Sequence, residues 1–330
     1  MSNVLSCFFP TTIVLVDDDL YFVESLKELL ETINVTCKIF TNPTKALEYI
    51  NDVSTSNKLD YSDLIRDGEE GTSDWTSILL NINGLHREIY SSDRFMRISV
   101  VISDYKMQEM SGVELCSSVF DTNIQRILLT GVADDTTGVE AFNDGYITRF
   151  VRKGSTSFES DFIENINRSI FQYFRPYTNY VTKHVSIVGS THLSDYIFSD
   201  FFSKVYSSGN YVESYMLDAF GSYLLMDADG KANILSVMTE NELSKLIEIG
   251  IASEEIDPVV LAQLQSRKYL IAFHDRLGTL PPIAEWAKHI YPATRIDGYQ
   301  TYYCALNVAE PDIDYKNVVS FNSYKKSRRI

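Results

Sequence analysis

The N-terminal half of the sequence alternates short aliphatic runs with amphipathic segments, and this alternation limits the folds open to it. Ile13–Val16 is an unbroken run of β-branched and aliphatic residues. A run of this length and composition is typical of a strand buried on both faces of a parallel sheet. Similar runs that predict strands lie at 35–40, 98–103, 126–130 and 146–151.

Segments with apolar residues at helical spacing separate these runs. They predict helices over about 20–32, 43–50, 137–143 and 158–174. Strands that alternate with helices are typical of a doubly wound α/β fold with a parallel sheet. Sheets of this kind bind ligands in the crevice beyond the carboxyl ends of their strands.

Acidic and polar residues stand where the predicted strands end. Asp17 and Asp18 follow the first strand, Asp104 follows the third, Thr130 ends the fourth, and Lys153 follows the fifth. Three carboxylates at one sheet edge would repel one another unless a cation lay among them, and oxygen ligands of this kind suit Mg²⁺. A hydroxyl and an ammonium beside the metal can bind a phosphoryl group. The pattern therefore predicts a phosphoryl-transfer site that uses Mg²⁺.

Four segments in this order resemble the receiver domain of two-component response regulators. They are Val16–Asp19, Ser103–Gly112, Leu128–Gly131 and Phe150–Lys153. The resemblance implies a (βα)₅ receiver (CheY-like) domain over residues 10–174. We expect a phosphoacceptor rather than an enzyme, apart from self-dephosphorylation, and catalysis by the output domain stays open.

The resemblance assigns a role to each residue of the site. Asp104 would accept a phosphoryl group from a sensor histidine kinase. Asp17 and Asp18 would hold Mg²⁺ together with Asp104 and the backbone carbonyl of Lys106.

The remaining roles concern binding of the phosphoryl group and the response to it. Thr130 and Lys153 would bind the phosphoryl group, and Thr130 would form a switch pair with Phe150. The sequence departs from the family at Gln108 and Gly154, because the family usually has proline at both positions. We expect these changes to loosen the loop after Asp104 and to alter the approach of Lys153.

Asp104 follows Asp18 by 86 positions, roughly double the family's usual spacing. The excess predicts an insertion over about 51–97, with a polar loop at 51–74 and a helix at 78–90. Such an insertion need not disturb the site, because surface loops cost little entropy to lengthen.

The second half of the chain is predicted to be an α+β output domain over 186–330, after a linker at 175–185. Its expected hairpin pairs 223–226 with 232–237 around the turn Asp227–Gly230. Expected helices lie at 240–249, 258–265 and 282–290, and expected strands at 269–273 and 301–306. This order weakly resembles PAS-type sensory modules. The basic residues 325–329 are expected to be a solvated terminus.

Charge and composition limit the functions of the chain. The net charge is −16, of which residues 1–174 carry −13, so binding of a polyanion across that half is disfavoured. The four scattered cysteines favour reduced core residues over a zinc site or a disulfide framework. No run approaches the ~20 apolar residues of a membrane helix, so we expect a cytoplasmic protein without a membrane partner.

Several functions of the output domain stay open at this point. The leading hypothesis is a phosphorylatable switch that forms a homodimer through the face made by 137–143, 146–151 and 158–174. The chain also resembles quorum-sensing response regulators of the α-hydroxyketone type. The alternatives are a receiver-controlled enzyme, a domain that binds a nucleotide or small molecule, a DNA-binding regulator, and an interaction adaptor. DNA binding is open but not indicated, because no helix-turn-helix stands out.

Overall fold

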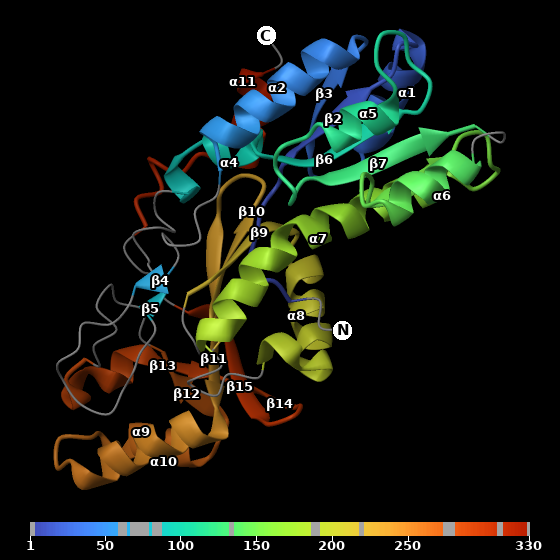
Figure 1. Ribbon diagram of the computed structural model, residues 1–330. Helices are drawn as coiled ribbons and strands as arrows, with labels where there is room; N and C mark the ends of the chain where they lie inside the picture. The colour runs from blue at the N-terminus through green and yellow to red at the C-terminus, as the bar shows by residue number, and fades with distance from the viewer. Residues whose placement is uncertain are drawn as a thin grey trace. The chain divides into compact units, whose positions relative to one another are not determined.

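The chain forms two compact units, each assembled from separate stretches of sequence (Figure 1). The computed structural model describes residues 4–58, 65–66, 79–80, 88–131, 135–185, 192–217, 221–272, 281–308 and 313–328. The parallel-sheet unit comprises Phe9–Leu59, Ser91–Pro176 and Tyr324–Ile330. The antiparallel-sheet unit comprises Met1–Phe8, Asp60–Tyr90 and Tyr177–Ser323.

A five-stranded parallel sheet in the order β3-β2-β6-β7-β8 forms the centre of the parallel-sheet unit. Its strands are β2 (Thr12–Val16), β3 (Thr36–Phe40), β6 (Ile98–Asp104), β7 (Gln125–Thr130) and β8 (Arg149–Arg152). Every residue of β2 is buried, as its unbroken aliphatic run predicted. The predicted doubly wound α/β fold is confirmed.

Helices cover this sheet. They are α1 (Leu20–Leu30), α2 (Pro43–Ser56), α4 (Asp93–Met96), α5 (Gly112–Ser117), α6 (Asp135–Asn143) and α7 (Phe158–Val185). Helices α1 and α7 meet through the rings of Phe22 and Phe158, 6.3 Å apart. Helix α2 contacts α5. Helix α5 was not predicted, since it is only six residues long.

The structure differs from the prediction within the 51–97 insertion. Helix α2 continues to Ser56, because Ala46, Ile50 and Val53 form one buried face. Leu79–Leu80 form strand β5, which pairs with β4 (Ile65–Arg66), so the predicted helix does not begin at 78. Residues 88–90 are helical, and the rest of the predicted loop and helix lies outside the described residues.

Residues 175–185, predicted as a linker, are the last part of the 28-residue helix α7. Pro176 removes one backbone hydrogen bond from that helix. Tyr177 and Val181 are each 1% exposed and lie one turn apart, so burial of this face outweighs the missing bond. Thr178 adds a hydrogen bond of 2.9 Å from the backbone N–H of Ser6 to its hydroxyl.

The antiparallel-sheet unit is built on a six-stranded sheet in the order β1-β9-β10-β11-β15-β14. Its strands are β1 (Cys7–Phe8), β9 (Tyr211–Met216), β10 (Tyr223–Asp227), β11 (Ala232–Thr239), β14 (Thr294–Asp297) and β15 (Thr301–Val308). Strands β10 and β11 form the predicted hairpin, with Tyr223 opposite Leu235. A second, two-stranded sheet pairs β12 (Tyr269–Ile271) with β13 (Ile290–Pro292).

Helices complete this unit and give it an α+β architecture, as predicted. They are η3 (His192–Ser194), α8 (Tyr196–Ser208), α9 (Glu240–Ala252), α10 (Pro258–Gln265) and η4 (Ile283–His289). The aromatic core between α8 and the sheet includes Phe198, Phe202, Tyr223 and Tyr302. The segment predicted as a helix at 282–290 forms the 3₁₀ helix η4, in which Trp286 is buried. The resemblance to PAS-type modules stays a prediction.

The basic C-terminal segment is helical as far as Ser327, and residues 326–328 are exposed, as expected of a solvated terminus; residue 329 lies outside the described residues. Helix α11 spans Phe321–Ser327. Tyr324 is 7% exposed and its ring lies 5.2 Å from that of Phe95. The aromatic contact holds this segment at Tyr324. Among the described residues, no helix is both long enough and apolar enough to cross a bilayer.

Candidate functional site

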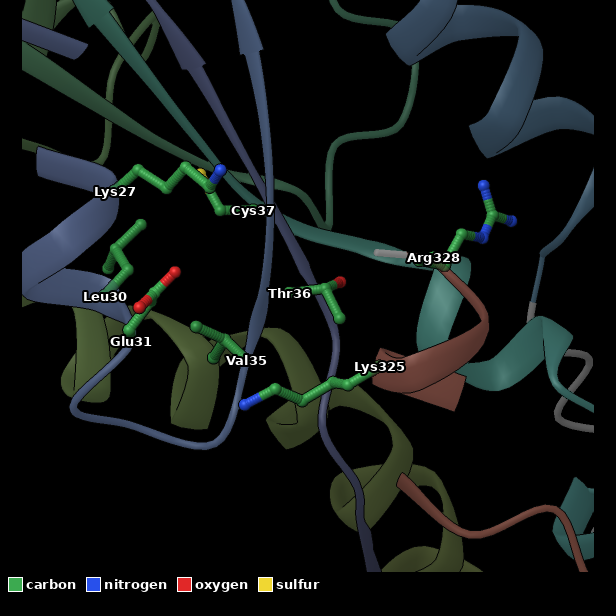
Figure 2. A pocket seen from close by; sticks show the side chains of 8 residues that line it. All are labelled: Lys27, Leu30, Glu31, Val35, Thr36, Cys37, Lys325 and Arg328. Atoms are coloured by element: carbon green, nitrogen blue, oxygen red, sulfur yellow. The ribbon is translucent and has the colours of Figure 1, made fainter. Parts of the chain in front are cut away.

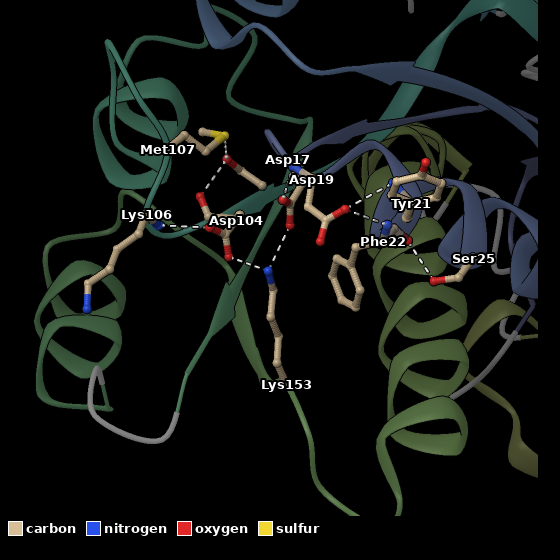
Figure 3. A network of polar contacts seen from close by, with 10 residues as sticks. Asp17, Asp19, Tyr21, Phe22, Ser25, Asp104, Lys106, Met107 and Lys153 are labelled. Carbon is tan, nitrogen blue, oxygen red and sulfur yellow. Dashed lines mark hydrogen bonds and ion pairs between the residues drawn. The ribbon is translucent and has the colours of Figure 1, made fainter.

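Three carboxylates meet at the carboxyl edge of the parallel sheet, and Figure 3 shows two of them, Asp17 and Asp104. Asp17 and Asp18 follow β2, and Asp104 ends β6. Each offers one oxygen, and these oxygens lie within 4.8 Å of one another. Asp17 is 2% exposed, and a set of oxygen ligands on different strands fits Mg²⁺. The site is therefore suited to this ion.

Lys153, directly after β8, supplies the positive charge at this edge. Its Nζ lies 2.7 Å from Asp17 Oδ2 and 2.6 Å from Asp104 Oδ1. Burial lowers the pKa of Lys153, but hydrogen bonds to the two carboxylates outweigh that effect and leave the pKa raised. Burial raises the pKa of Asp17, and the hydrogen bond from Lys153 offsets only part of this. The Lys153 ammonium thus does not fully offset the cost of burying the Asp17 carboxylate.

The loop after Asp104 is held close to the sheet. A Cβ at Gly112 would lie 2.1 Å from the backbone oxygen of Asp104, so only glycine allows this approach. The backbone N–H of Lys106 donates to Asp104 Oδ2 over 3.0 Å. Glu109 has a φ of 68°, and its carboxylate accepts a hydrogen bond of 2.9 Å from Asn42 Nδ2. This contact supports the loop that lacks the family's proline.

The predicted switch residues lie beside the same edge. Thr130 is fully buried, and its Oγ1 has no hydrogen-bond partner among the described residues. Phe150 is 38% exposed. A Cβ at Gly138 would lie 3.5 Å from the ring of Phe150 and 3.6 Å from the methyl of Thr130, so both side chains border this glycine. An unpartnered buried hydroxyl can donate to an incoming phosphoryl oxygen.

Every predicted site residue therefore lies at or next to one sheet edge, but the roles that we assign to them stay predictions. The sequence also pointed less clearly to two further residues. Asp19 caps α1 by accepting hydrogen bonds from the backbone N–H groups of Tyr21 and Phe22. The helical spacing of Phe22 and Leu26 favours a core position for Phe22, but the buried residues of α1 are Val23, Leu26 and Leu30. Phe22 instead lies under Lys153.

A solved structure matches the chain over nearly its whole length. The response regulator LqsR from Legionella pneumophila is 26% identical, with a TM-score of 0.81, over 99% of this chain and 97% of that one. Over nearly its whole length, the chain is similar to a response regulator. No protein-family model and no curated protein sequence matches it.

Shorter solved structures match about half of this chain. A receiver domain from Clostridium thermocellum is 22% identical over 48% of this chain and 94% of its own length, with a TM-score of 0.32. An adenylate cyclase from Rhodopirellula baltica is 24% identical over 54% of this chain and 97% of its own length, with a TM-score of 0.34. At these TM-scores, neither likeness bears on function.

A pocket of about 190 Å³ lies elsewhere in the parallel-sheet unit (Figure 2). Its lining residues are Lys27, Leu30, Glu31, Val35, Thr36, Cys37, Lys325 and Arg328. Burial raises the pKa of the Cys37 thiol to about 12, so the thiolate that a nucleophile requires is scarce at neutral pH. None of the predicted site residues lines this pocket.

Proposed function

We propose that Asp104 accepts a phosphoryl group from the phosphohistidine of a sensor kinase in a two-component phosphorelay. The observation that carries this proposal is the meeting of Asp17, Asp18 and Asp104 around Lys153. The side chain of Asp104 is 13% exposed, which leaves it open to a donor. An Asp104 oxygen bonds to phosphorus as the phosphorus–nitrogen bond breaks, and the histidine nitrogen keeps that electron pair.

The neighbouring residues have separate tasks in this reaction. Lys153 offsets the charge of the phosphoryl oxygens, and the unpartnered Thr130 hydroxyl donates to one of them. The carboxylates of Asp17, Asp18 and Asp104 and the backbone carbonyl of Lys106 would hold Mg²⁺. When bound, this ion supplies further positive charge to the phosphoryl oxygens.

The test is labelling with acetyl phosphate and Mg²⁺, followed by intact-protein mass spectrometry. The wild type should gain the mass of one phosphoryl group, and Asp104→Asn should gain none. Asp52→Asn, which changes an exposed carboxylate on α2, is the matched control and should be labelled like the wild type. Labelling of Asp104→Asn to the wild-type level would refute the assignment. Asp18→Ala should lose labelling unless Mg²⁺ is raised.

Phosphorylation is proposed to change the face formed by α6, β8 and α7. A phosphoryl group that draws Thr130 inward opens space beside Gly138, and Phe150 can fill it. Exposed apolar side chains gather on this face: Val139, Phe142, Tyr146 and Phe150. We propose that this apolar face supports a homodimer favoured by phosphorylation.

Charged residues contribute little to that dimer. Arg168 forms an ion pair of 2.5 Å with Glu164 on its own helix. Burial and the nearby Arg168 lower the pKa of Arg149, so these two arginines repel each other. The apolar side chains are therefore the main source of stability in the proposed contact.

The antiparallel-sheet unit is proposed to be the output domain. The proposed sequence boundaries are 10–174, 175–185 and 186–330; of these residues, 177–185 belong to the antiparallel-sheet unit and 324–330 to the parallel-sheet unit. We also propose a cytoplasmic location and a role in quorum sensing of the α-hydroxyketone type. The full-length likeness to a response regulator supports an output of the same architecture. The proposal assigns neither catalysis nor DNA binding to this unit.

A further inference from the structure

The first turn of α1 brings an aromatic ring to the phosphorylation edge. Asp19 caps the helix and accepts hydrogen bonds from the backbone N–H groups of Tyr21 (3.0 Å) and Phe22 (3.2 Å). The Lys153 ammonium lies over the Phe22 ring, 4.3 Å from its centroid (Figure 3). A cation in this position is attracted to the negative face of the ring.

The ring of Phe22 has firm support from α7. It lies 6.3 Å from the ring of Phe158, which stacks on Phe162 at 5.6 Å. Phe162 is fully buried. The three rings therefore link the core beneath α7 to the ammonium of Lys153.

The backbone around Lys153 does not fix the direction of its ammonium group, so the contacts of that group decide where it points. Gly154 has a φ of 78°, and a Cβ there would meet nothing within 4 Å. Glycine in this open position restrains the chain after Lys153 little. The Lys153 backbone itself is held, because its N–H donates to the Thr130 carbonyl over 2.8 Å, but this bond does not fix the end of the long side chain. The direction of the ammonium is thus set by what it touches, which is Asp17, Asp104 and the Phe22 ring.

The three contacts respond differently to the proposed reaction. Phosphorylation changes the charge of Asp104, and a cation at Asp17 competes for the same carboxylate. The Phe22 ring is uncharged and lies on a helix that contacts α7, so neither change alters the charge of the ring or its support. We propose that Phe22 is a positioning residue that keeps the Lys153 ammonium at the phosphoryl site throughout the reaction. This inference rests on the proposed role of Asp104.

The experiment compares Phe22→Leu, which keeps apolar volume but removes the ring face, with Phe22→Tyr, which keeps the face. Labelling rates with acetyl phosphate and Mg²⁺ are measured for both and for the wild type. We expect Phe22→Leu to be about three- to tenfold slower and Phe22→Tyr to retain most of the rate. Phe120→Leu removes an exposed ring elsewhere in the same unit and should not change the rate.

Nuclear magnetic resonance gives a readout that does not depend on phosphorylation. The ring current of Phe22 should shift the ε-methylene protons of Lys153 upfield, and Phe22→Leu should remove that shift while the melting temperature stays close to the wild-type value. The Lys153 signal is assigned by its loss in Lys153→Met.

The outcomes separate this inference from the function on which it rests. If the wild type is not labelled, the proposed role of Asp104 fails, and the Lys153 shift still reports on the ring contact. If the wild type is labelled but Phe22→Leu matches its rate, the positioning role is wrong. Equal losses in Phe22→Leu and Phe22→Tyr would also overturn it, because the ring face would not be the cause.

Discussion

Buried carboxylates in the two units differ in how many hydrogen bonds and ion pairs offset the cost of burying their charge. In the antiparallel-sheet unit, Asp195 is fully buried and accepts hydrogen bonds from the backbone N–H groups of Ile197, Phe198 and Tyr299. In the parallel-sheet unit, Asp17 shares one ammonium with Asp104, and burial still raises its pKa. The carboxylate of Asp195 thus has hydrogen-bond donors within the fold, whereas the carboxylates of Asp17 and Asp104 share one ammonium and could bind a further cation.

Glu240 in the antiparallel-sheet unit extends this contrast. Burial alone would raise its pKa, but hydrogen bonds from Tyr303, Arg267 and Ser244 leave the pKa lowered. Its partners thus stabilise the ionised form, whereas those of Asp17 do not. A carboxylate whose ionised form is poorly compensated by hydrogen bonds is a better candidate for function than one that is fully bonded.

The largest effect that tests this contrast is expected at Asp195. Asp195→Ala removes three backbone hydrogen bonds and the cap of α8, so the free energy of unfolding should fall by about 3 kcal/mol. Asp257→Ala, which removes a single bond at the exposed cap of α10, should lose about 1 kcal/mol. Denaturant unfolding measures both losses. Equal losses would show that burial of Asp195 does not increase the contribution of its hydrogen bonds to stability.

The next effect concerns Mg²⁺. At ten times the dissociation constant, the ion should raise the free energy of unfolding of the wild type by about 1.4 kcal/mol. Asp17→Asn should gain nothing from Mg²⁺ and, without it, should unfold at the same denaturant concentration as the wild type or higher, because a poorly compensated charge is removed. Asp52→Asn should respond like the wild type. A Mg²⁺ effect retained in Asp17→Asn would place the ion elsewhere.

The sequence predicted the two units unequally well. Buried parallel strands are continuous aliphatic runs, so β2, β6 and β7 could be recognised, and their ends located the site. Helix α8 was missed, although Phe198, Phe202 and Tyr206 recur at helical spacing. Strand β9 was missed because Glu213 and Ser214 interrupt its apolar residues, so no aliphatic run marks it. The position of Phe22 could not be predicted, because an aromatic residue at helical spacing is usually part of the core.

A smaller effect is expected on dimerisation through the face formed by α6, β8 and α7. Phe142 is 52% exposed there, and Phe142→Ser should weaken the dimer formed with a phosphoryl mimic such as beryllofluoride by about fivefold, or ~1 kcal/mol. Phe120→Ser, which changes a ring that is 76% exposed outside this face, is the control. Light scattering over a range of protein concentrations gives both values. A wild type that stays monomeric with the mimic at high concentration would contradict the proposed dimer.

The smallest effect is expected at Glu240, whose side chain is 44% exposed. Because the folded-state pKa of Glu240 is lowered, its ionised form adds stability that is present above the unfolded pKa, near 4.5, and is lost as the pH falls through the folded value. Glu240→Gln should therefore be slightly less stable than the wild type at pH 7, and the difference should shrink toward zero under acid. Denaturant unfolding at a series of pH values measures this difference. A gap that widened on acidification would mean that the bonds from Arg267 and Tyr303 do not favour the ionised carboxylate, and the contrast with Asp17 would lose its basis.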